Sequence, residues 1–329
     1  MAAAGGQEET RPGWWAGLWR RDRRPPMPGR LVEVRGLRLH LEEFGSGPPA
    51  ILMVHGYLGS TGIWYAVSER IARAAGVRVL LVDLPGAGYS DKPLEAPYTL
   101  PWLGEYLYAL VQQLRLRAPL LVGHSLGGAA CLHALARHPD LARALVLVSP
   151  LVFRPPPPPG LRLAKKYPGP ARAFFQSAGR LVIPHLVKRA LYANGNFDAR
   201  ASARLLLSFL DAPGGWEAAT RMGLRAHDYS PDAELLARVK LPTMVIWGGQ
   251  DSSHDPELAK RLHLALGGRA GLVVLPRAGH NCHEEEPERF TDLVAGWFHR
   301  WKGANPSNVE HPGGPAAVPP VQDPGTTAE

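Results

Sequence analysis

The sequence predicts an α/β protein, a mostly parallel, doubly wound sheet that carries an inserted helical cap. Six short apolar runs have the length and the Val, Leu and Ile content of strands that are buried on both faces. Amphipathic stretches with helical spacing separate most of these runs. The alternation lapses only over residues 152–238. Strands that alternate with helices favour a parallel sheet, and the lapse marks the place of an insertion.

The expected elements follow in chain order. The opening stretch LVEVRGLRLHLEEFG is typical of a short antiparallel hairpin at the edge of the sheet. One helix is indicated by a leucine stripe and another by an aromatic and aliphatic stripe near the end of the folded part. The leucine stripe comprises Leu103, Leu107, Leu110 and Leu114, and the second stripe comprises Phe290, Leu293, Val294, Trp297, Phe298 and Trp301. The buried strands are expected at residues 50–56, 77–86, 119–125, 144–150, 242–251 and 271–280.

The predicted domain organisation is a core, a cap and two tails. The core comprises residues 30–151 and 239–302, and the cap comprises residues 152–238. The cap begins with RPPPPPG, which breaks any helix, and continues with helical segments such as ASARLLLSFL. Residues 1–29 and 303–329 are rich in Gly, Pro and charged or small polar residues, so we expect disordered tails.

Composition narrows the class of protein. With 329 residues, 45% apolar and 20% charged, the chain is long enough for a sizeable core. The two cysteines, Cys131 and Cys282, build neither a disulfide framework nor a paired CxxC zinc site, which favours a cytoplasmic location. No secretory h-region and no run of about 18 apolar residues is found, so we expect a protein that is neither secreted nor transmembrane.

The charged residues are unevenly distributed along the chain. The formal net charge is +8, and residues 152–238 hold 13 Lys and Arg against 6 Asp and Glu. No nucleic-acid-binding pattern accompanies the excess, so a solvated basic surface is the simpler interpretation and no nucleic-acid partner is expected. In the first tail Trp15, Leu18 and Trp19 have helical spacing and precede Arg20, Arg21, Arg23 and Arg24. The pattern allows a weak membrane-surface contact; the other interpretation is a free tail or one that docks on its own domain.

Ser125 is the first candidate for chemistry. It ends the apolar run PLLVGHS, precedes a helical stretch, and lies between Gly123 and Gly127. The pattern Gly-x-Ser-x-Gly between a strand and a helix is the nucleophile elbow, where the tight turn requires small flanking residues. The turn places the hydroxyl near the positive end of the next helix, to which the N–H of Leu126 belongs.

Two later strand ends supply partners for this serine. Asp251 closes VIWGGQD and His280 closes VVLPRAGH. The resulting chain order Ser, Asp, His is the one found in folds that carry a nucleophile elbow. A base that takes the serine proton and an acid that orients the base complete a nucleophilic site. Asp255 and His283 compete for these assignments, but they are better explained as a helix cap and the start of the next helix. Tyr57, after Gly56, offers a second oxyanion N–H.

The crowding in HNCHE suggests a metal site, but its spacing matches neither an HExxH helix nor paired CxxC ligands, so no metal is expected.

With these motifs the chain resembles the α/β-hydrolase superfamily, in particular its capped serine esterases and lipases. The resemblance covers about residues 30–302 and is carried by HGYLGS, DLPGAGYSDKP, VGHSLGG, VIWGGQD and AGHNCHEEEPERF. It implies that Ser125 is the nucleophile, Asp251 the acid and His280 the base. It further implies that Tyr57 and Leu126 supply the oxyanion N–H groups, that no cofactor is needed, and that the pocket is shaped by His55, Gly56 and His124.

The expected reaction is hydrolysis of a carboxylic ester through an acyl-enzyme. Haloalkane dehalogenases and capped epoxide hydrolases use an Asp at the position of Ser125, which argues against both. Carbon-carbon bond hydrolases usually carry Asn and Trp where this chain has His124 and Asn281. A thioesterase, an acyltransferase and a carbon-carbon bond hydrolase stay open as alternatives, with a non-catalytic binding protein more remote. Apolar and aromatic residues in the cap favour a small apolar ester or a lipid as the substrate.

Overall fold

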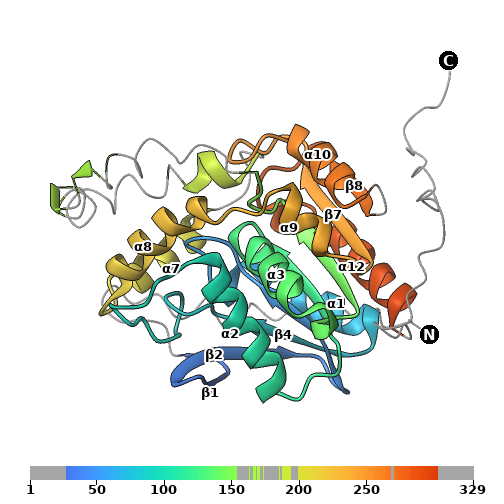
Figure 1. The fold of residues 1–329 in the computed structure, drawn as a ribbon, viewed down its shortest axis with the longest axis horizontal. Helices are drawn as coiled ribbons and strands as arrows, with labels where there is room; N and C mark the ends of the chain where they lie inside the picture. Colours follow the sequence, from blue (N-terminus) through green and yellow to red (C-terminus); the bar gives the residue numbers. More distant parts are fainter. Residues whose placement is uncertain are drawn as a thin grey trace, which may run out of the picture.

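The computed structural model describes residues 27–153, 187–193, 199–267 and 270–302, with a few positions between 163 and 185 (Figure 1). The predicted tail 303–329, residues 1–26 of the other tail and much of the first half of the predicted cap lie outside the described residues. The residues considered for a membrane contact, Trp15, Leu18, Trp19 and the arginines after them, lie outside them too.

The core is one eight-stranded sheet, as the sequence predicted. Its spatial order is β1-β2-β4-β3-β5-β6-β7-β8. The β1–β2 hairpin lies at one edge and pairs antiparallel with β4, whereas all later pairs are parallel. The strand bounds are β1 Arg30–Val34, β2 Leu37–Phe44, β3 Pro49–Val54, β4 Arg78–Val82, β5 Leu120–His124, β6 Ala144–Val148, β7 Thr243–Gly248 and β8 Gly271–Leu275.

All six buried strands form where they were expected, but each is shorter than its apolar run. Strand β4 ends at Val82 although the run continues to residue 86, and β8 ends at Leu275 although the run continues to 280. Most of the excess residues are polar residues, Gly and Pro in the loops at the carboxyl ends of the strands. These loops are the place where an open α/β sheet binds its ligands.

Both faces of the sheet are covered, which explains the continuous apolar runs. Along β3, Leu52 and Val54 belong to one hydrophobic cluster, whereas Ile51 and Met53 belong to the other. Helices α2, α3, α9 and α10 cover the first face, and α1 and α12 cover the second (Figure 1). Their bounds are α1 Ser68–Ala75, α2 Leu100–Gln113, α3 Leu126–Arg137, α9 Ala233–Arg238, α10 Glu257–Ala265 and α12 Pro287–Trp301.

Three described helices fall in the range predicted as the cap. They are α7 Ala199–Leu210, α8 Gly215–Asp228 and α9. Helices α7 and α8 lie side by side (Figure 1). The buried face of α8 consists mostly of small residues, which allows the helix to approach the core closely. These residues are Gly215, Ala218, Ala219, Met222, Gly223 and Ala226.

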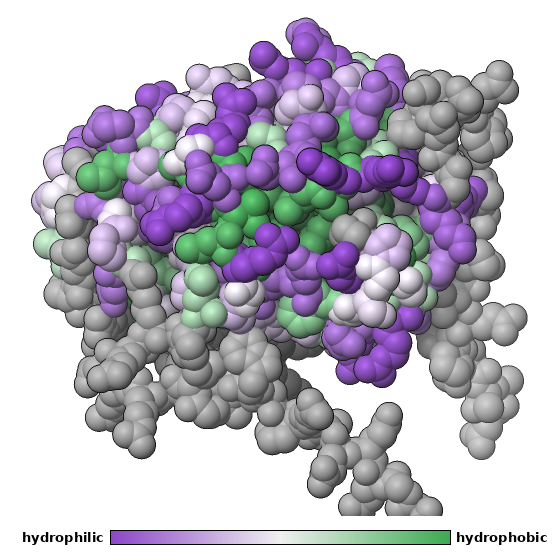
Figure 2. All heavy atoms as spheres, turned by 90° about the horizontal axis from the view of Figure 1, so that it is seen from below, coloured by the Kyte–Doolittle hydropathy of each residue, from purple (hydrophilic) through white to green (hydrophobic). Residues whose placement is uncertain are grey.

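The surface of the molecule carries both hydrophobic and hydrophilic residues. Figure 2 shows hydrophobic residues gathered in the middle of the face below β1 and β2, bordered and crossed by hydrophilic ones. Large hydrophobic side chains with considerable exposure include Met27 and Leu31. Among the described residues, no helix has both the length and the apolar composition that a membrane crossing requires.

Candidate active site

Ser125 occupies a strained turn between β5 and α3. Its backbone has φ +50° and ψ −117°, a conformation that costs a non-glycine residue on the order of 1–3 kcal/mol. The turn is held by a hydrogen bond from Ser125 N to Val148 O of 2.9 Å. A Cβ on Gly123 would lie 2.6 Å from Gly128 Cα, and one on Gly127 would lie 2.3 Å from His55 O. Glycine is therefore required on both sides of Ser125, as the motif predicted.

His280 and Asp251 form a buried hydrogen-bonded pair. Asp251 Oδ2 accepts from His280 Nδ1 at 2.8 Å, and the two side chains are 0% and 4% exposed. Asp251 Oδ1 accepts from the backbone N–H groups of Ser253 and His254, at 2.8 and 2.9 Å. Burial alone would raise the pKa of Asp251, but His280 and these contacts bring it below its ordinary value. The carboxylate thus fixes a His280 tautomer with hydrogen on Nδ1 and a free Nε2.

Other histidines surround His280. The ring centroids of His124 and His254 lie 4.7 and 4.8 Å from that of His280. Burial lowers the pKa of His254 to about 4 and that of His124 well below its usual range. Because these neighbours are neutral near pH 7, they do not repel a positive charge that develops on His280. The Nε2–H of His124 donates to the carbonyl oxygen of His280 at 3.2 Å.

Asp255 and His283, which compete in the sequence with Asp251 and His280, make other contacts. Asp255 Oδ1 accepts from Glu257 N at 2.9 Å at the start of α10, as expected of a cap. His283 lies in the short helix α11, Cys282–Glu285, with its ring 4.5 Å from that of Trp64. Burial lowers the pKa of His283 to about 3. Neither residue offers the contact that joins Asp251 to His280.

One cluster of the described residues has the donor set of a metal site. Asp251, His254 and His280 offer ligand atoms that all lie within 4.8 Å of one another. Of the HNCHE segment only His280 belongs to it. The hydrogen bond between Asp251 and His280 already joins two of the three side chains.

The turn after β3 lies against Ser125. A Cβ on Gly56 would lie 2.9 Å from Ser125 Cβ and 2.7 Å from His124 Nδ1, so only glycine fits here. His55 Nδ1 donates to Gly56 O at 2.7 Å, and His55 Nε2 accepts from Leu84 N at 3.0 Å. Because a peptide N–H points away from its own C=O, the first bond also directs the N–H of Tyr57. The fully buried His55 thus holds the turn; its predicted part in shaping the pocket stays a prediction.

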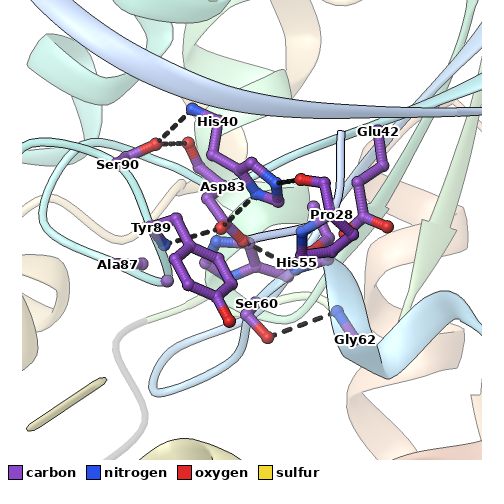
Figure 3. A network of polar contacts seen from close by, with 12 residues as sticks. Pro28, His40, Glu42, His55, Ser60, Gly62, Asp83, Ala87, Tyr89 and Ser90 are labelled. Carbon is purple, nitrogen blue, oxygen red and sulfur yellow. Dashed lines mark hydrogen bonds and ion pairs between the residues drawn. The ribbon is translucent and has the colours of Figure 1, made fainter. Parts of the chain in front are cut away.

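A second buried polar cluster supports the same turn (Figure 3). Asp83, directly after β4, accepts from His40 Nδ1 at 2.7 Å, Thr61 N at 2.7 Å and Tyr89 N at 2.9 Å. His40 Nε2 donates to Pro28 O at 2.5 Å. With both nitrogens donating, His40 carries a proton on each, and Asp83 raises its pKa although burial opposes this. The pKa of Asp83 is lowered in return, against the effect of its burial.

Sequence reasoning missed this His40–Asp83 pair. The available signals were a histidine inside the alternating apolar strand LHLEEF and an aspartate at the end of a buried strand. Ser90 completes a second Ser, His and Asp set, because its Oγ accepts from His40 N at 2.9 Å and donates to Asp83 O at 2.7 Å. All three side chains are buried and their polar atoms are engaged with one another and the backbone. This cluster is therefore structural rather than a second catalytic site.

Comparison with known proteins identifies the fold family. The family model described as "alpha/beta hydrolase fold" matches residues 49–287. The chain is 30% identical over 279 residues to the dihydrolipoyllysine-residue acetyltransferase component of the acetoin cleaving system of Pseudomonas putida, which covers 84% of this chain and 70% of that protein. It is 29% identical over 268 residues to the pimeloyl-[acyl-carrier protein] methyl ester esterase of Aeromonas hydrophila, which covers 78% of this chain and 98% of that protein.

The fold is also that of a solved esterase from Exiguobacterium antarcticum, with a TM-score of 0.69, 21% identity, and coverage of 82% of this chain and 99% of that one. The matched range begins at β3 and ends at the start of α12, so it contains the turn at Gly56, the elbow at Ser125 and the Asp251–His280 pair. The chain belongs to the α/β-hydrolase fold family.

Proposed function

We propose that the protein is a serine hydrolase that cleaves the carboxylic ester of a small apolar molecule or a lipid through an acyl-enzyme. The observation that carries this proposal is the 2.8 Å hydrogen bond between Asp251 and His280, in a chain whose Ser125 occupies a strained elbow under the Gly56 turn. The hydrogen bond orients an imidazole base, and the elbow places a hydroxyl at the start of α3.

In the proposed reaction Ser125 Oγ attacks the ester carbonyl while His280 Nε2 takes the hydroxyl proton. The carbonyl oxygen becomes an oxyanion, which accepts from the N–H groups of Tyr57 and Leu126. The N–H of Leu126 is available because the first N–H groups of a helix lack an intrahelical acceptor. Collapse of the intermediate breaks the C–O bond, and the His280 proton goes to the leaving alcohol.

The second half of the reaction repeats these steps with water. His280 takes a proton from water, the hydroxide adds to the acyl carbon, and Ser125 leaves with that proton. Asp251 stabilises the imidazolium in both halves. The low pKa values of the neighbouring His254 and His283 support this role, because two further positive charges would disfavour the imidazolium.

The test uses a fluorophosphonate probe, which labels an activated serine without knowledge of the substrate, and a p-nitrophenyl ester series of rising acyl length. We expect wild type to be labelled and to turn over esters, and Ser125→Ala to lose both. The control is Ser208→Ala, since Ser208 lies on α7 and its hydroxyl donates to Leu205 O. A wild type that reacts with neither probe nor esters contradicts the proposal.

Acyl transfer is a second candidate. The relative in Pseudomonas putida is named as an acetyltransferase component, and Ser125 and His280 are only 7% and 3% exposed, which restricts access of water. If transfer dominates, an added alcohol or thiol accelerates release of p-nitrophenol and appears in the product. A hydrolase yields the free acid at an unchanged rate.

A further inference from the structure

Tyr57 joins two parts of the molecule that are far apart in sequence. Its backbone N–H belongs to the turn that lies against Ser125, next to Gly56. Its side chain points to α8, where the hydroxyl donates to Ala219 O at 3.0 Å. One residue thus connects the proposed oxyanion site with a cap helix.

The contact on α8 is closely fitted. A Cβ on Gly223 would lie 2.6 Å from the Tyr57 hydroxyl oxygen and 2.7 Å from its ring carbon Cζ. Ala219 and Gly223 are one turn apart on the same face of α8, so the phenol lies over two of the smallest residues of the helix. Burial of the phenol raises the pKa of Tyr57, so the hydroxyl stays a donor at every ordinary pH.

Helix α8 is itself fixed to the core. Ala218, Met222 and Ala226 belong to the hydrophobic cluster on the α2 and α3 face of the sheet. At its start, a Cβ on Gly214 would lie 2.8 Å from Lys92 O, which shows how closely the helix meets the loop before α2. The acceptor of the Tyr57 hydroxyl is therefore held at a fixed place relative to the sheet.

The turn that carries Tyr57 needs such support. The next residue, Leu58, has φ +58°, a left-handed conformation that is uncommon for a non-glycine residue. The carbonyl side of the Gly56–Tyr57 peptide is held by His55 Nδ1 at 2.7 Å and by Gly59 N at 3.1 Å. On the Cα side of the same peptide, the side chain of Tyr57 is anchored by its hydrogen bond to Ala219 O.

We propose that α8, through the phenol of Tyr57, holds the Tyr57 N–H in the direction that the oxyanion requires, which makes Tyr57 a positioning residue as well as a donor. The inference rests on the proposed function. It also assigns Ala219 and Gly223 a place in catalysis that is remote from Ser125 in sequence. Because a displacement of about 1 Å at a reacting group costs about 10²-fold in rate, a shift of α8 alters turnover without touching substrate.

The experiment compares three variants with wild type. Tyr57→Phe removes the hydroxyl and keeps the ring, whereas Gly223→Ala forces the phenol and the helix apart. The matched control is Gly296→Ala on α12, where a Cβ meets nothing within 4 Å. We measure kcat and KM for a short p-nitrophenyl ester, normalised to the fraction of enzyme that a fluorophosphonate titrates. We also measure the affinity for a trifluoromethyl ketone, whose adduct with Ser125 carries an oxyanion.

Removal of a whole oxyanion donor costs about 10²–10³ in kcat, so we expect a smaller loss, of about 10-fold, in Tyr57→Phe. Gly223→Ala is expected to lose more, because its clash moves the ring itself. Affinity for the ketone should fall by the same factor as kcat, with KM changed by less than about 2-fold, because only the transition state carries the oxyanion. The control should match wild type.

Two results overturn the inference. The first is that Tyr57→Phe and Gly223→Ala both have the same kcat and the same affinity for the ketone as the control Gly296→Ala. The other is a change confined to KM or to the amount of folded enzyme, which indicates that Tyr57 only packs the cap. A wild type that neither turns over the ester nor reacts with the fluorophosphonate is a different failure. It overturns the proposed function, and the inference with it.

Discussion

At the scale of single residues, the acid partner of His280 is a choice between two aspartates four positions apart. Asp251 contacts His280 Nδ1 at 2.8 Å, whereas Asp255 caps α10. Sequence reasoning favoured Asp251 because it follows a buried strand. The structure places the two side chains in different environments, and this difference gives a direct test.

We expect Asp251→Asn to lower kcat by about 10⁴-fold, because an amide in this place favours the wrong tautomer of the histidine. KM should change little, because the carboxylate does not touch substrate. Asp255→Asn should retain kcat and stability, since asparagine caps helices as well as aspartate does. Steady-state kinetics on one ester decide the matter. Equal losses of kcat in both variants, or a loss confined to Asp255→Asn, would show that the assignment of Asp251 as the acid is wrong.

At the scale of elements, the strands were easier to predict than the contacts between loops. The alternation of Ile51 and Met53 with Leu52 and Val54 requires a sheet that is covered on both faces, and hydrophobicity alone shows this. The sequence placed the carboxyl ends of the strands several residues too far along the chain, because the predicted ranges included the Gly, Pro and Asp residues of the following loops. Strand ends were still enough to select Ser125, Asp251 and His280 as candidates, because ligands of an open α/β sheet bind just beyond the carboxyl ends of its strands.

Contacts that depend on tertiary packing were not predictable from the sequence. The hydroxyl of Tyr57 and its acceptor Ala219 O are 162 residues apart. His40 and Asp83 are 43 residues apart; His40 lies on β2 and Asp83 directly after the neighbouring strand β4. Neither pair has a local pattern, and the second becomes visible only once β2 is known to pair with β4. The functions of His55 as a support of the turn and of α8 as an anchor depend on the same packing.

The His40–Asp83 pair joins strand β2, the loop after β4 and the backbone at Thr61, and its loss should weaken all three contacts. Asp83→Asn leaves a buried imidazolium without its carboxylate, so we expect the free energy of unfolding to fall by about 3–5 kcal/mol near pH 6. The control is Asp91→Asn. Asp91 pairs with Arg38 at 2.9 Å at the surface, where such a pair contributes about 0–1 kcal/mol. Urea unfolding measures both differences.

The difference between wild type and Asp83→Asn should depend on pH. The pKa of His40 is raised on folding, so its contribution is complete below about pH 6.5 and is lost as the pH rises through the folded pKa. The pKa of Asp83 is lowered, so its contribution is present above about pH 4 and is lost as the pH falls through the folded pKa. A difference that stays constant from pH 4 to pH 10 would show that the pair is not charged.

At the scale of the whole molecule, the distribution of charge is the feature that bears on substrate. The net charge is +8, and residues 152–238 hold most of the excess. Among the described residues of α8, the side chains of Arg221 and Arg225 are 45% and 58% exposed. Arg221 lies 4.0 Å from an oxygen of Glu95, whose side chain is 94% exposed, and Arg225 lies 4.0 Å from an oxygen of Asp228, whose side chain is 53% exposed. Both ion pairs are therefore weak. The 13 Lys and Arg against 6 Asp and Glu in the sequence of the predicted cap still favour a positive surface there.

An anionic substrate should be attracted to this surface, and salt should weaken the attraction. The Debye length falls from about 30 Å at 0.01 M to about 8 Å at 0.15 M, so charges on the cap cease to act on a distant ester. We expect kcat/KM for an ester with a carboxylate at the end of its acyl chain to fall several-fold over this range. A neutral ester of the same length should change little, because it has no charge to attract.

The double variant Arg221→Gln and Arg225→Gln distinguishes the electrostatic effect of α8 from that of the rest of the molecule. It removes two charges from α8 and leaves the buried face that contacts Tyr57 unchanged, so the neutral ester should react as with wild type. The salt dependence for the anionic ester should become shallower. If both esters respond to salt alike in wild type, the positive surface does not select substrate, and the apolar residues of the cap then determine specificity.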